Sequence, residues 1–301
     1  MLRRTIVVAA AAIAPLTIHS GVADTEARQS DPATPGIRLT RLQLSTGVAL
    51  QVAETGPGDA EPVLFPHGYP DSWFSYTPVL GRLPAHIRAI VPSQRGHGDS
   101  ERPGCCYRVA DFAADAVALL DQLGIRRATI VGHSMGSFVA QRIAMDHPER
   151  VTRLVLIGSG ITLSTKPLVE FNQVVQSLTD PIAMPFIREF QESTAFVPLQ
   201  EGFLDGLVKE SAKIPARVWR DALAGIMSDD GRGEQSRIQV STLLIWGEHD
   251  GLFSRADQDA LQHSIRGSRL VVYEQTSHSP HWERPDRFIS DLIEFLKTPA
   301  R

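Results

Sequence analysis

The sequence predicts an α/β fold built on a mostly parallel sheet, and three observations lead to this prediction. Short, continuous apolar runs recur along the chain, which is typical of strands buried on both faces of a sheet. Amphipathic segments with a helical period separate them, so strands and helices alternate. Of the 301 residues 43% are hydrophobic and 21% are charged, as in ordinary globular proteins. A chain of this length can bury a large core as one domain with an insertion.

Eight strands and four flanking helices follow in chain order. The first two strands, 37–44 and 49–54, alternate apolar and polar residues around a turn at 45–47, which predicts an antiparallel hairpin. The later apolar runs predict parallel strands at 63–65, 89–92, 128–131, 154–157, 242–246 and 270–273. Helical periods predict helices at 110–123, 137–146, 256–263 and 287–296.

The stretch from residue 160 to residue 237 interrupts this alternation. It has a helical period broken by five prolines and stands between two predicted strands of the core. We therefore expect a core made of residues 37–159 and 238–301, with residues 160–237 inserted into it as a helical segment.

The N-terminal residues have the pattern of an export signal. Residues 1–23 begin with paired arginines, continue as an Ala-rich apolar run and end in small residues, which predicts a secretory signal peptide. The run is too short to span a membrane, so we expect no stable membrane anchor. The arginine pair also fits a twin-arginine signal, and either route predicts a secreted or periplasmic protein. Residues 24–36 are polar and contain two prolines, which predicts a flexible lead-in.

The glycine-rich turn at residues 132–136, Gly-His-Ser-Met-Gly, is the first chemical signal. It follows a strand-like run and opens a helix-like run, which is the context of a nucleophile elbow. The flanking positions need glycine because a Cβ atom there would meet neighbouring backbone. The turn raises the Ser134 hydroxyl above the sheet and directs the backbone N–H of Met135 at a developing oxyanion. Ser134 is therefore the predicted nucleophile.

A serine nucleophile needs a base, and the base needs an orienting carboxylate. With an elbow nucleophile these partners follow in the order Asp or Glu, then His. Asp250 comes just after the strand predicted at 242–246, and His278 follows the strand predicted at 270–273. Because ligand and catalytic groups gather at the carboxyl ends of parallel strands, we predict Asp250 as the carboxylate and His278 as the base.

Five motifs together resemble the α/β-hydrolase-fold serine hydrolases, over about residues 37–297. They are His-Gly-Tyr-Pro at 67–70, Arg-Gly-His-Gly-Asp-Ser at 95–100, the elbow at 132–136, Trp-Gly-Glu-His-Asp at 246–250 and Ser-His-Ser-Pro-His-Trp-Glu at 277–283. The resemblance implies an eight-stranded, mostly parallel sheet and an esterase-like or lactonase-like activity. It also implies a second oxyanion donor, the backbone N–H of Tyr69, beside that of Met135.

Similar hydrolases carry a helical lid where this chain has residues 160–237, and the resemblance implies the same role here. The apolar residues of this segment favour a hydrophobic acyl or alcohol group, or a lactone ring, in the substrate. Some of them are expected to form the core of the lid and others to line the pocket. His133 and Trp73 are predicted to contact substrate.

The predicted reaction is hydrolysis of a carboxylic ester or lactone through an acyl-enzyme. The loop at 67–73 closely resembles that of epoxide hydrolases, but those enzymes use an elbow aspartate and lid tyrosines, which this chain lacks. Haloalkane dehalogenases also need the aspartate. Three alternatives stay open: a cofactor-free perhydrolase or haloperoxidase, a carbon–carbon hydrolase, and a non-catalytic ligand receptor on the same fold.

Several neighbouring residues have competing interpretations. His281 could replace His278 as base, and Glu248 could replace Asp250 as carboxylate. We expect the ring of His67 to hold the oxyanion loop through backbone hydrogen bonds. His97 is expected to be structural, and Glu283 is expected to order its loop through a salt bridge or a helix cap.

The remaining features limit cofactors and partners. A net charge of −4 gives no electrostatic reason to expect nucleic acid as a partner. The chain has no metal-ligand cluster or phosphate-binding glycine loop, so we expect no metal, no cofactor and a small-molecule substrate. The oligomeric state stays open. The adjacent Cys105 and Cys106 could form a vicinal disulfide or both stay reduced.

Overall fold

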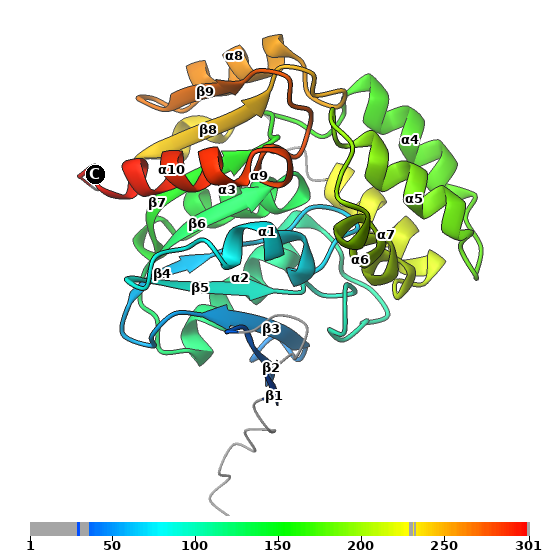
Figure 1. Ribbon diagram of the computed structural model, residues 1–301, viewed down its shortest axis with the longest axis horizontal. Coiled ribbons are helices and arrows are strands. Elements are labelled where there is room, and N and C mark those ends of the chain that lie inside the picture. The colour runs from blue at the N-terminus through cyan, green and yellow to red at the C-terminus, as the bar shows by residue number, and fades with distance from the viewer. Residues whose placement is uncertain (1–28, 31–35, 229–230, 232, 300–301) are drawn as a thin grey trace, which may run out of the picture.

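A computed structural model describes residues 29–30, 36–228, 231 and 233–299 of the chain. Its centre is a twisted sheet with the strand order β1-β2-β3-β5-β4-β6-β7-β8-β9 (Figure 1). The strands from β5 to β9 in this order are parallel, whereas β1, β2 and β3 pair in antiparallel fashion. The mostly parallel α/β architecture is therefore confirmed. The predicted signal peptide, residues 1–23, lies outside the described residues.

All eight predicted strands form, with small shifts at their ends. They are β2 (Arg38–Gln43), β3 (Ala49–Thr55), β4 (Glu61–Leu64), β5 (Ile87–Pro92), β6 (Ala128–His133), β7 (Val151–Ile157), β8 (Thr242–Gly247) and β9 (Arg269–Tyr273). The predicted hairpin joins β2 to β3, with Gly47 at φ +84° in its turn. A ninth strand, β1 (Gln29–Ser30), pairs with β2 inside the segment predicted as a flexible lead-in. Two residues carry no periodicity, so this strand was not predictable.

The central strands bury both faces, which explains their continuous apolar runs. In β7, Leu154 and Leu156 belong to the core on one face, whereas Val155 and Ile157 belong to the core on the other face. This division follows from the two-residue period of a strand. Each face of the sheet therefore needs a layer of helices to exclude water.

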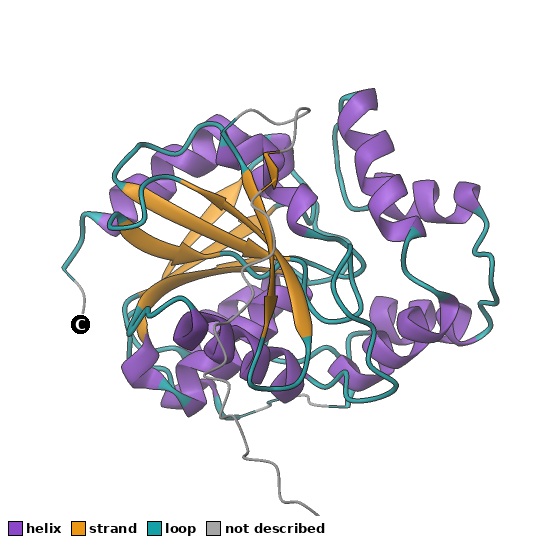
Figure 2. Cartoon of the chain, turned by 90° about the horizontal axis from the view of Figure 1, so that it is seen from below, coloured by secondary structure: helices purple, strands orange, loops and turns teal. Residues whose placement is uncertain are grey.

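Helices cover both faces of the sheet (Figure 2). The first core cluster includes side chains of α2 (Val109–Gln122), α3 (Met135–Asp146) and α8 (Arg255–Ser264). The second includes side chains of α1 (Thr77–Leu80), α10 (Pro285–Leu296) and the short η1 (Trp73–Tyr76). The four predicted core helices all form. Three short helical turns are also present among the described residues: η2 (Pro148–Arg150), η3 (Gln235–Arg237) and α9 (Pro280–Glu283).

In the described part of the segment between β7 and β8, four α-helices lie together beside the sheet (Figure 1). They are α4 (Lys166–Gln176), α5 (Met184–Ser193), α6 (Glu201–Ala212) and α7 (Ala216–Met227). We call residues 160–237 the helical insertion. Among the described residues, no helix combines the length and the apolar character needed to cross a membrane.

A disulfide joins the adjacent Cys105 and Cys106 in the loop before α2. The same loop is held by Arg95, which donates a hydrogen bond to the carbonyl of Cys106 (2.8 Å). The Arg95 guanidinium also binds both carboxylate oxygens of buried Asp115 at 2.7 Å. A bidentate, buried pair of this kind fixes the geometry of the groups that it joins. The loop is thereby attached to α2.

Candidate active site

Ser134 occupies a strained turn between β6 and α3. Its φ of 50° and ψ of −120° lie outside the regions that most residues adopt, and its N–H donates to the carbonyl of Ile157 at 2.9 Å. The flanking glycines permit the turn. An added Cβ on Gly132 would lie 2.2 Å from the carbonyl oxygen of Gly136, and one on Gly136 would lie 2.1 Å from that of Pro66. The backbone therefore has the strand–turn–helix geometry that the motif predicts.

Asp250 and His278 form a buried hydrogen-bonded pair. Oδ2 of Asp250 lies 2.9 Å from Nδ1 of His278, and the side chains of His278 and Asp250 are 3% and 0% exposed. The other carboxylate oxygen, Oδ1, accepts the backbone N–H groups of Leu252 (2.8 Å) and Phe253 (3.1 Å). These two bonds fix the carboxylate, so Oδ2 is the oxygen that faces the imidazole. A neutral imidazole that donates from Nδ1 has its acceptor at Nε2.

The structure brings Ser134 and His278 to one cavity, from the loops after β6 and β9. Nε2 of His278 is buried and has no hydrogen-bond partner within the described part of the chain. Asp250, from the loop after β8, lies behind the imidazole. The three predicted residues thus lie together at the carboxyl ends of parallel strands. Nε2 of His278 is therefore available to accept a hydrogen bond from a group in the cavity.

The ring of His67 holds its own loop in place through backbone hydrogen bonds, as predicted. One ring nitrogen, Nδ1, lies 2.8 Å from the carbonyl oxygen of Gly68, and the other, Nε2, accepts the backbone N–H of Gln94 at 2.9 Å. The second bond requires an unprotonated Nε2, so the ring is neutral. Burial, followed by the nearby His97, lowers the pKa of His67 well below its ordinary value.

The two candidate oxyanion donors both belong to residues that line the cavity. Met135 is the first residue of α3, where a backbone N–H has no partner within the helix. Tyr69 belongs to the same loop as His67, and its hydroxyl donates to the carbonyl of Trp219 in α7 at 2.9 Å. The Tyr69 side chain is therefore attached to the helical insertion.

Of the two residues predicted to contact substrate, only one lines the cavity. His133 lines the cavity, and its ring lies 5.1 Å from that of His278, centroid to centroid. Trp73 does not: it is buried in the core and packs against Phe74, so its assignment to substrate binding is wrong. The turn into η1 directs this side chain to the core, which the sequence does not show.

The competing base and carboxylate lie in other surroundings. His281 is buried 4.5 Å from the ring of His133, and neither of its ring nitrogens has a partner among the described residues. Burial, together with the charge of His278, lowers the pKa of His281 well below its ordinary value. Glu248 is half-exposed beside His249. The geometry therefore favours His278 and Asp250 over both alternatives.

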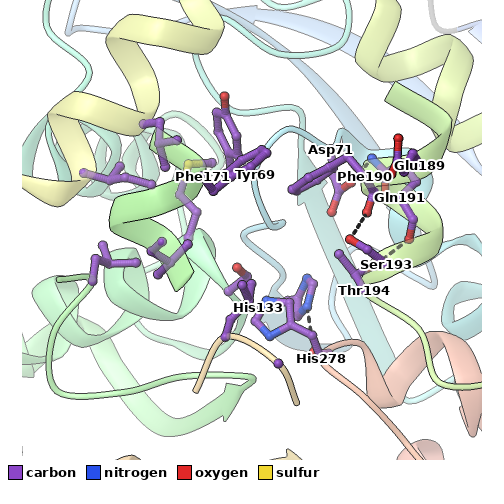
Figure 3. A pocket seen from close by; sticks show the side chains of 18 of the residues that line it. Tyr69, Asp71, His133, Phe171, Glu189, Phe190, Gln191, Ser193, Thr194 and His278 are labelled. Atoms are coloured by element: carbon purple, nitrogen blue, oxygen red, sulfur yellow. Dashed lines mark hydrogen bonds between the residues drawn. The ribbon is translucent and has the colours of Figure 1, made fainter. Parts of the chain in front are cut away.

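The cavity has a volume of about 460 Å³ and is lined mostly by apolar side chains. Many of these come from the helical insertion: Leu163, Leu168, Phe171, Val174, Phe186, Phe190, Leu223 and Ile226. One side of the cavity is polar instead, with Asp71, Glu189, Gln191, Ser193 and Thr194 grouped together (Figure 3). No Lys or Arg of the described residues lines it.

The large apolar residues of the helical insertion serve both of the expected roles. Phe171, Phe186 and Phe190 line the cavity, whereas Trp219 is fully buried beside them. Phe196 lies at the surface, where its ring stacks on His249 with centroids 4.2 Å apart. The helical period indicates which residues are apolar, but not which neighbour each one packs against.

Glu283 joins the helical insertion to the loop of His278. Its Oε1 accepts the backbone N–H of Ser277 (2.7 Å), and its Oε2 accepts those of Phe196 (2.7 Å) and Val197 (2.9 Å). Glu283 therefore orders its loop as expected, but by accepting backbone N–H groups and not through the expected salt bridge or helix cap. A carboxylate that accepts several N–H groups is a strong local restraint. The position of the backbone beside His278 is thus coupled to the insertion.

Asp71 is a site residue that the sequence analysis missed. It lines the cavity, its side chain is nearly inaccessible, and Nε2 of Gln191 donates to its Oδ1 at 3.1 Å. Burial raises the pKa of Asp71 to about 7, while the hydrogen bond from Gln191 and the charge of His278 act in the opposite direction. Its place directly after the His67–Pro70 motif was the available signal.

We expect Asp71→Asn to stabilise the protein at high pH. The folded protein keeps a proton on Asp71 that the unfolded chain has released, so stability falls as pH rises from about 4 to about 7. Between pH 5 and pH 8 this loss is at most about 3 kcal/mol. Urea unfolding of both proteins measures it. The variant should gain more at pH 8 than at pH 5, and an equal gain at both pH values would contradict the raised pKa.

No group of three or more His, Cys, Asp or Glu side chains within the described residues could hold a metal ion.

Comparisons with known proteins place this chain among hydrolases and related enzymes. It is 28% identical to a non-heme chloroperoxidase of Streptomyces lividans over 282 residues, which cover 84% of this chain and 98% of the relative. It is also 28% identical to the 2-hydroxymuconate semialdehyde hydrolase of Pseudomonas sp. (strain CF600) over 275 residues, 86% of this chain and 94% of the relative.

A solved structure has the same architecture. The crystal structure of a hydrolase from Pseudomonas aeruginosa PA01 matches with a TM-score of 0.78 at 26% identity, and the match covers 86% of this chain and 98% of that one. A family model described as the alpha/beta hydrolase fold matches residues 61–285. This range contains the elbow, Asp250 and His278, and the chain belongs to the α/β-hydrolase family.

Proposed function

We propose that this protein hydrolyses carboxylic esters or lactones that carry a hydrophobic group, through an acyl-enzyme on Ser134. The observation that carries the proposal is the buried Asp250–His278 hydrogen bond, whose imidazole lines the same cavity as Ser134 on its strained elbow. A buried carboxylate–imidazole pair next to a strained serine provides what nucleophilic acyl transfer needs. The mostly apolar cavity supports a hydrophobic substrate.

The proposed reaction has two halves. The Ser134 hydroxyl attacks the carbonyl carbon while Nε2 of His278 takes its proton, and the C–O bond to the alcohol then breaks as His278 returns that proton to the leaving oxygen. Water next attacks the acyl carbon while Nε2 of His278 takes its proton. The C–O bond to Ser134 then breaks, His278 returns the proton to the serine oxygen, and the acid leaves. Asp250 holds the ring and stabilises its protonated form. The N–H groups of Met135 and Tyr69 stabilise the oxyanion in both halves.

Two relatives suggest other reactions that use the same three residues. Perhydrolysis replaces water by hydrogen peroxide, and activity with peroxide and halide above ester hydrolysis would favour it. The substrate of a 2-hydroxymuconate semialdehyde hydrolase carries a carboxylate group. The cavity offers no Lys or Arg of the described residues to bind one, so it gives that reaction less support.

The proposal is tested by hydrolysis of p-nitrophenyl esters from acetate to decanoate. We expect a kcat/KM maximum at intermediate acyl length, because a cavity of about 460 Å³ accepts a medium chain before the helical insertion limits it. Covalent labelling by a fluorophosphonate should accompany the activity. A protein that neither hydrolyses any ester nor is labelled would fit the non-catalytic receptor instead.

A further inference from the structure

The polar side of the cavity contains a pair of oxygen atoms that accept no hydrogen bond from the described residues. One belongs to Gln191 in α5, which is 0% exposed and whose Nε2 donates both to Oδ1 of Asp71 (3.1 Å) and to Oγ of Ser211 (2.9 Å). Its Oε1 is buried and has no partner within the described part of the chain. Because a buried amide oxygen without a partner is costly, this arrangement calls for a donor from elsewhere.

The orientation of the Gln191 amide is fixed by its neighbours. Oγ of Ser211 donates its own hydrogen to the carbonyl of Leu207 (2.9 Å), so toward Gln191 it must accept. Ionised Asp71 also accepts at Oδ1. A flipped amide would place oxygen against both acceptors, which excludes the alternative assignment. Oε1 is therefore the unsatisfied atom.

Above its pKa of about 7, Asp71 is ionised and places a second acceptor beside the oxyanion loop. No hydrogen bond reaches its Oδ2 from the described residues, whereas Oδ1 is taken by Gln191. An added Cβ on Gly68 would lie 3.1 Å from this Oδ2, so the atom lies against the loop that carries Tyr69. Both Asp71 and Gln191 line the cavity that holds Ser134 (Figure 3).

The neighbouring groups on this side do not supply the missing donor. The hydroxyl of Ser193 donates to the carbonyl of Phe190 (2.7 Å), and that of Thr194 donates to the carbonyl of Gln191 (2.8 Å). The exposed Glu189 adds only acceptors. With no Lys or Arg from the described residues in the lining, this side of the cavity is complementary to a donor and not to an anion.

We propose that Asp71 and Gln191 form an acceptor subsite that binds a hydroxyl or ammonium group of the substrate. The substrate is then an ester or lactone with a hydrophobic part against the phenylalanines of the helical insertion and a donor group toward the polar side. This inference rests on the proposed function. It adds a specificity that the apolar lining alone does not give, because a site built to bind a donor discriminates against the analogue that lacks it.

The test compares esters of equal size with and without a donor at pH 8, where Asp71 is ionised. On the alcohol side the pair is 2-hydroxyethyl butanoate and propyl butanoate, and on the acyl side it is ethyl 3-hydroxypropanoate and ethyl butanoate. A third comparison, 2-(dimethylamino)ethyl butanoate, distinguishes an ammonium donor from a hydroxyl donor. We expect kcat/KM to be about tenfold higher for the donor ester in at least one pair.

Variants assign the preference to the subsite. Asp71→Leu and Gln191→Met should each bring the donor-to-alkyl ratio of kcat/KM close to one, whereas Asp259→Asn, a carboxylate on the exposed side of α8, should leave the ratio as in the unmodified protein. A ratio compares two substrates on one protein, so a partial loss of folded enzyme does not alter it. Two separate variants guard against one that fails to fold.

The outcomes separate this inference from the proposed function. Hydrolysis of all the esters without a preference for any donor ester would overturn the inference alone, and so would a preference that persists in both variants. Failure to hydrolyse any ester, together with no fluorophosphonate labelling, would overturn the proposed function and the subsite with it.

Discussion

Replacing Ser134 by alanine is expected to lower kcat for p-nitrophenyl butanoate by at least about 10³-fold and to abolish fluorophosphonate labelling. The variant keeps the elbow backbone but loses the only atom that can form the acyl-enzyme in the proposed mechanism. Nε2 of His278 would then lack the hydroxyl from which it takes the proton. Steady-state hydrolysis and intact-protein mass after labelling measure the two effects.

The matched control is Ser228→Ala, which removes an exposed hydroxyl just after α7. It should retain the activity and the labelling of the unmodified protein. If Ser134→Ala still hydrolysed the ester at a comparable rate, or still gained the mass of the phosphonyl group, another residue would be the nucleophile. That result would exclude the acyl-enzyme proposed here.

The fold was predictable because its determinants are local. Each central strand is a short apolar run, and the strand period alone assigns Leu154 and Val155 to opposite faces, as the two cores show. The two-residue β1 was not predictable, since so short a strand depends on β2 beside it. The packing of the helical insertion depends on long-range contacts such as Tyr69 with Trp219, which no sequence period reports.

The candidate site was predictable where chain order carries the information. The elbow motif and the strand ends are sufficient to single out Ser134, Asp250 and His278. The fold brings Ser134 and His278 to one cavity, with Asp250 hydrogen-bonded to the imidazole of His278. The position of the Asp71 carboxyl depends on its hydrogen bond with Gln191, 120 residues away, and no sequence motif predicts this contact. Trp73 was wrongly assigned to the cavity because a position next to a motif does not determine where the side chain points.

Replacing Asp250 by asparagine is expected to lower kcat by about 10³- to 10⁴-fold while the protein stays folded. The backbone N–H groups of Leu252 and Phe253 both require an oxygen at the position of Oδ1. The asparagine amide must therefore turn its oxygen toward them and its NH₂ toward His278. The imidazole then has to accept at Nδ1 and carry its hydrogen on Nε2, where it can no longer take the serine proton.

The control for this variant is Glu248→Gln, which removes the neighbouring half-exposed carboxylate without touching the imidazole of His278. Its kcat should stay within about twofold of the unmodified protein, because an exposed charge is largely screened by water. A large loss in Glu248→Gln with little loss in Asp250→Asn would exchange the two roles. A small loss in both would mean that His278 keeps its tautomer without either carboxylate. The Asp250–His278 hydrogen bond would then not contribute to catalysis.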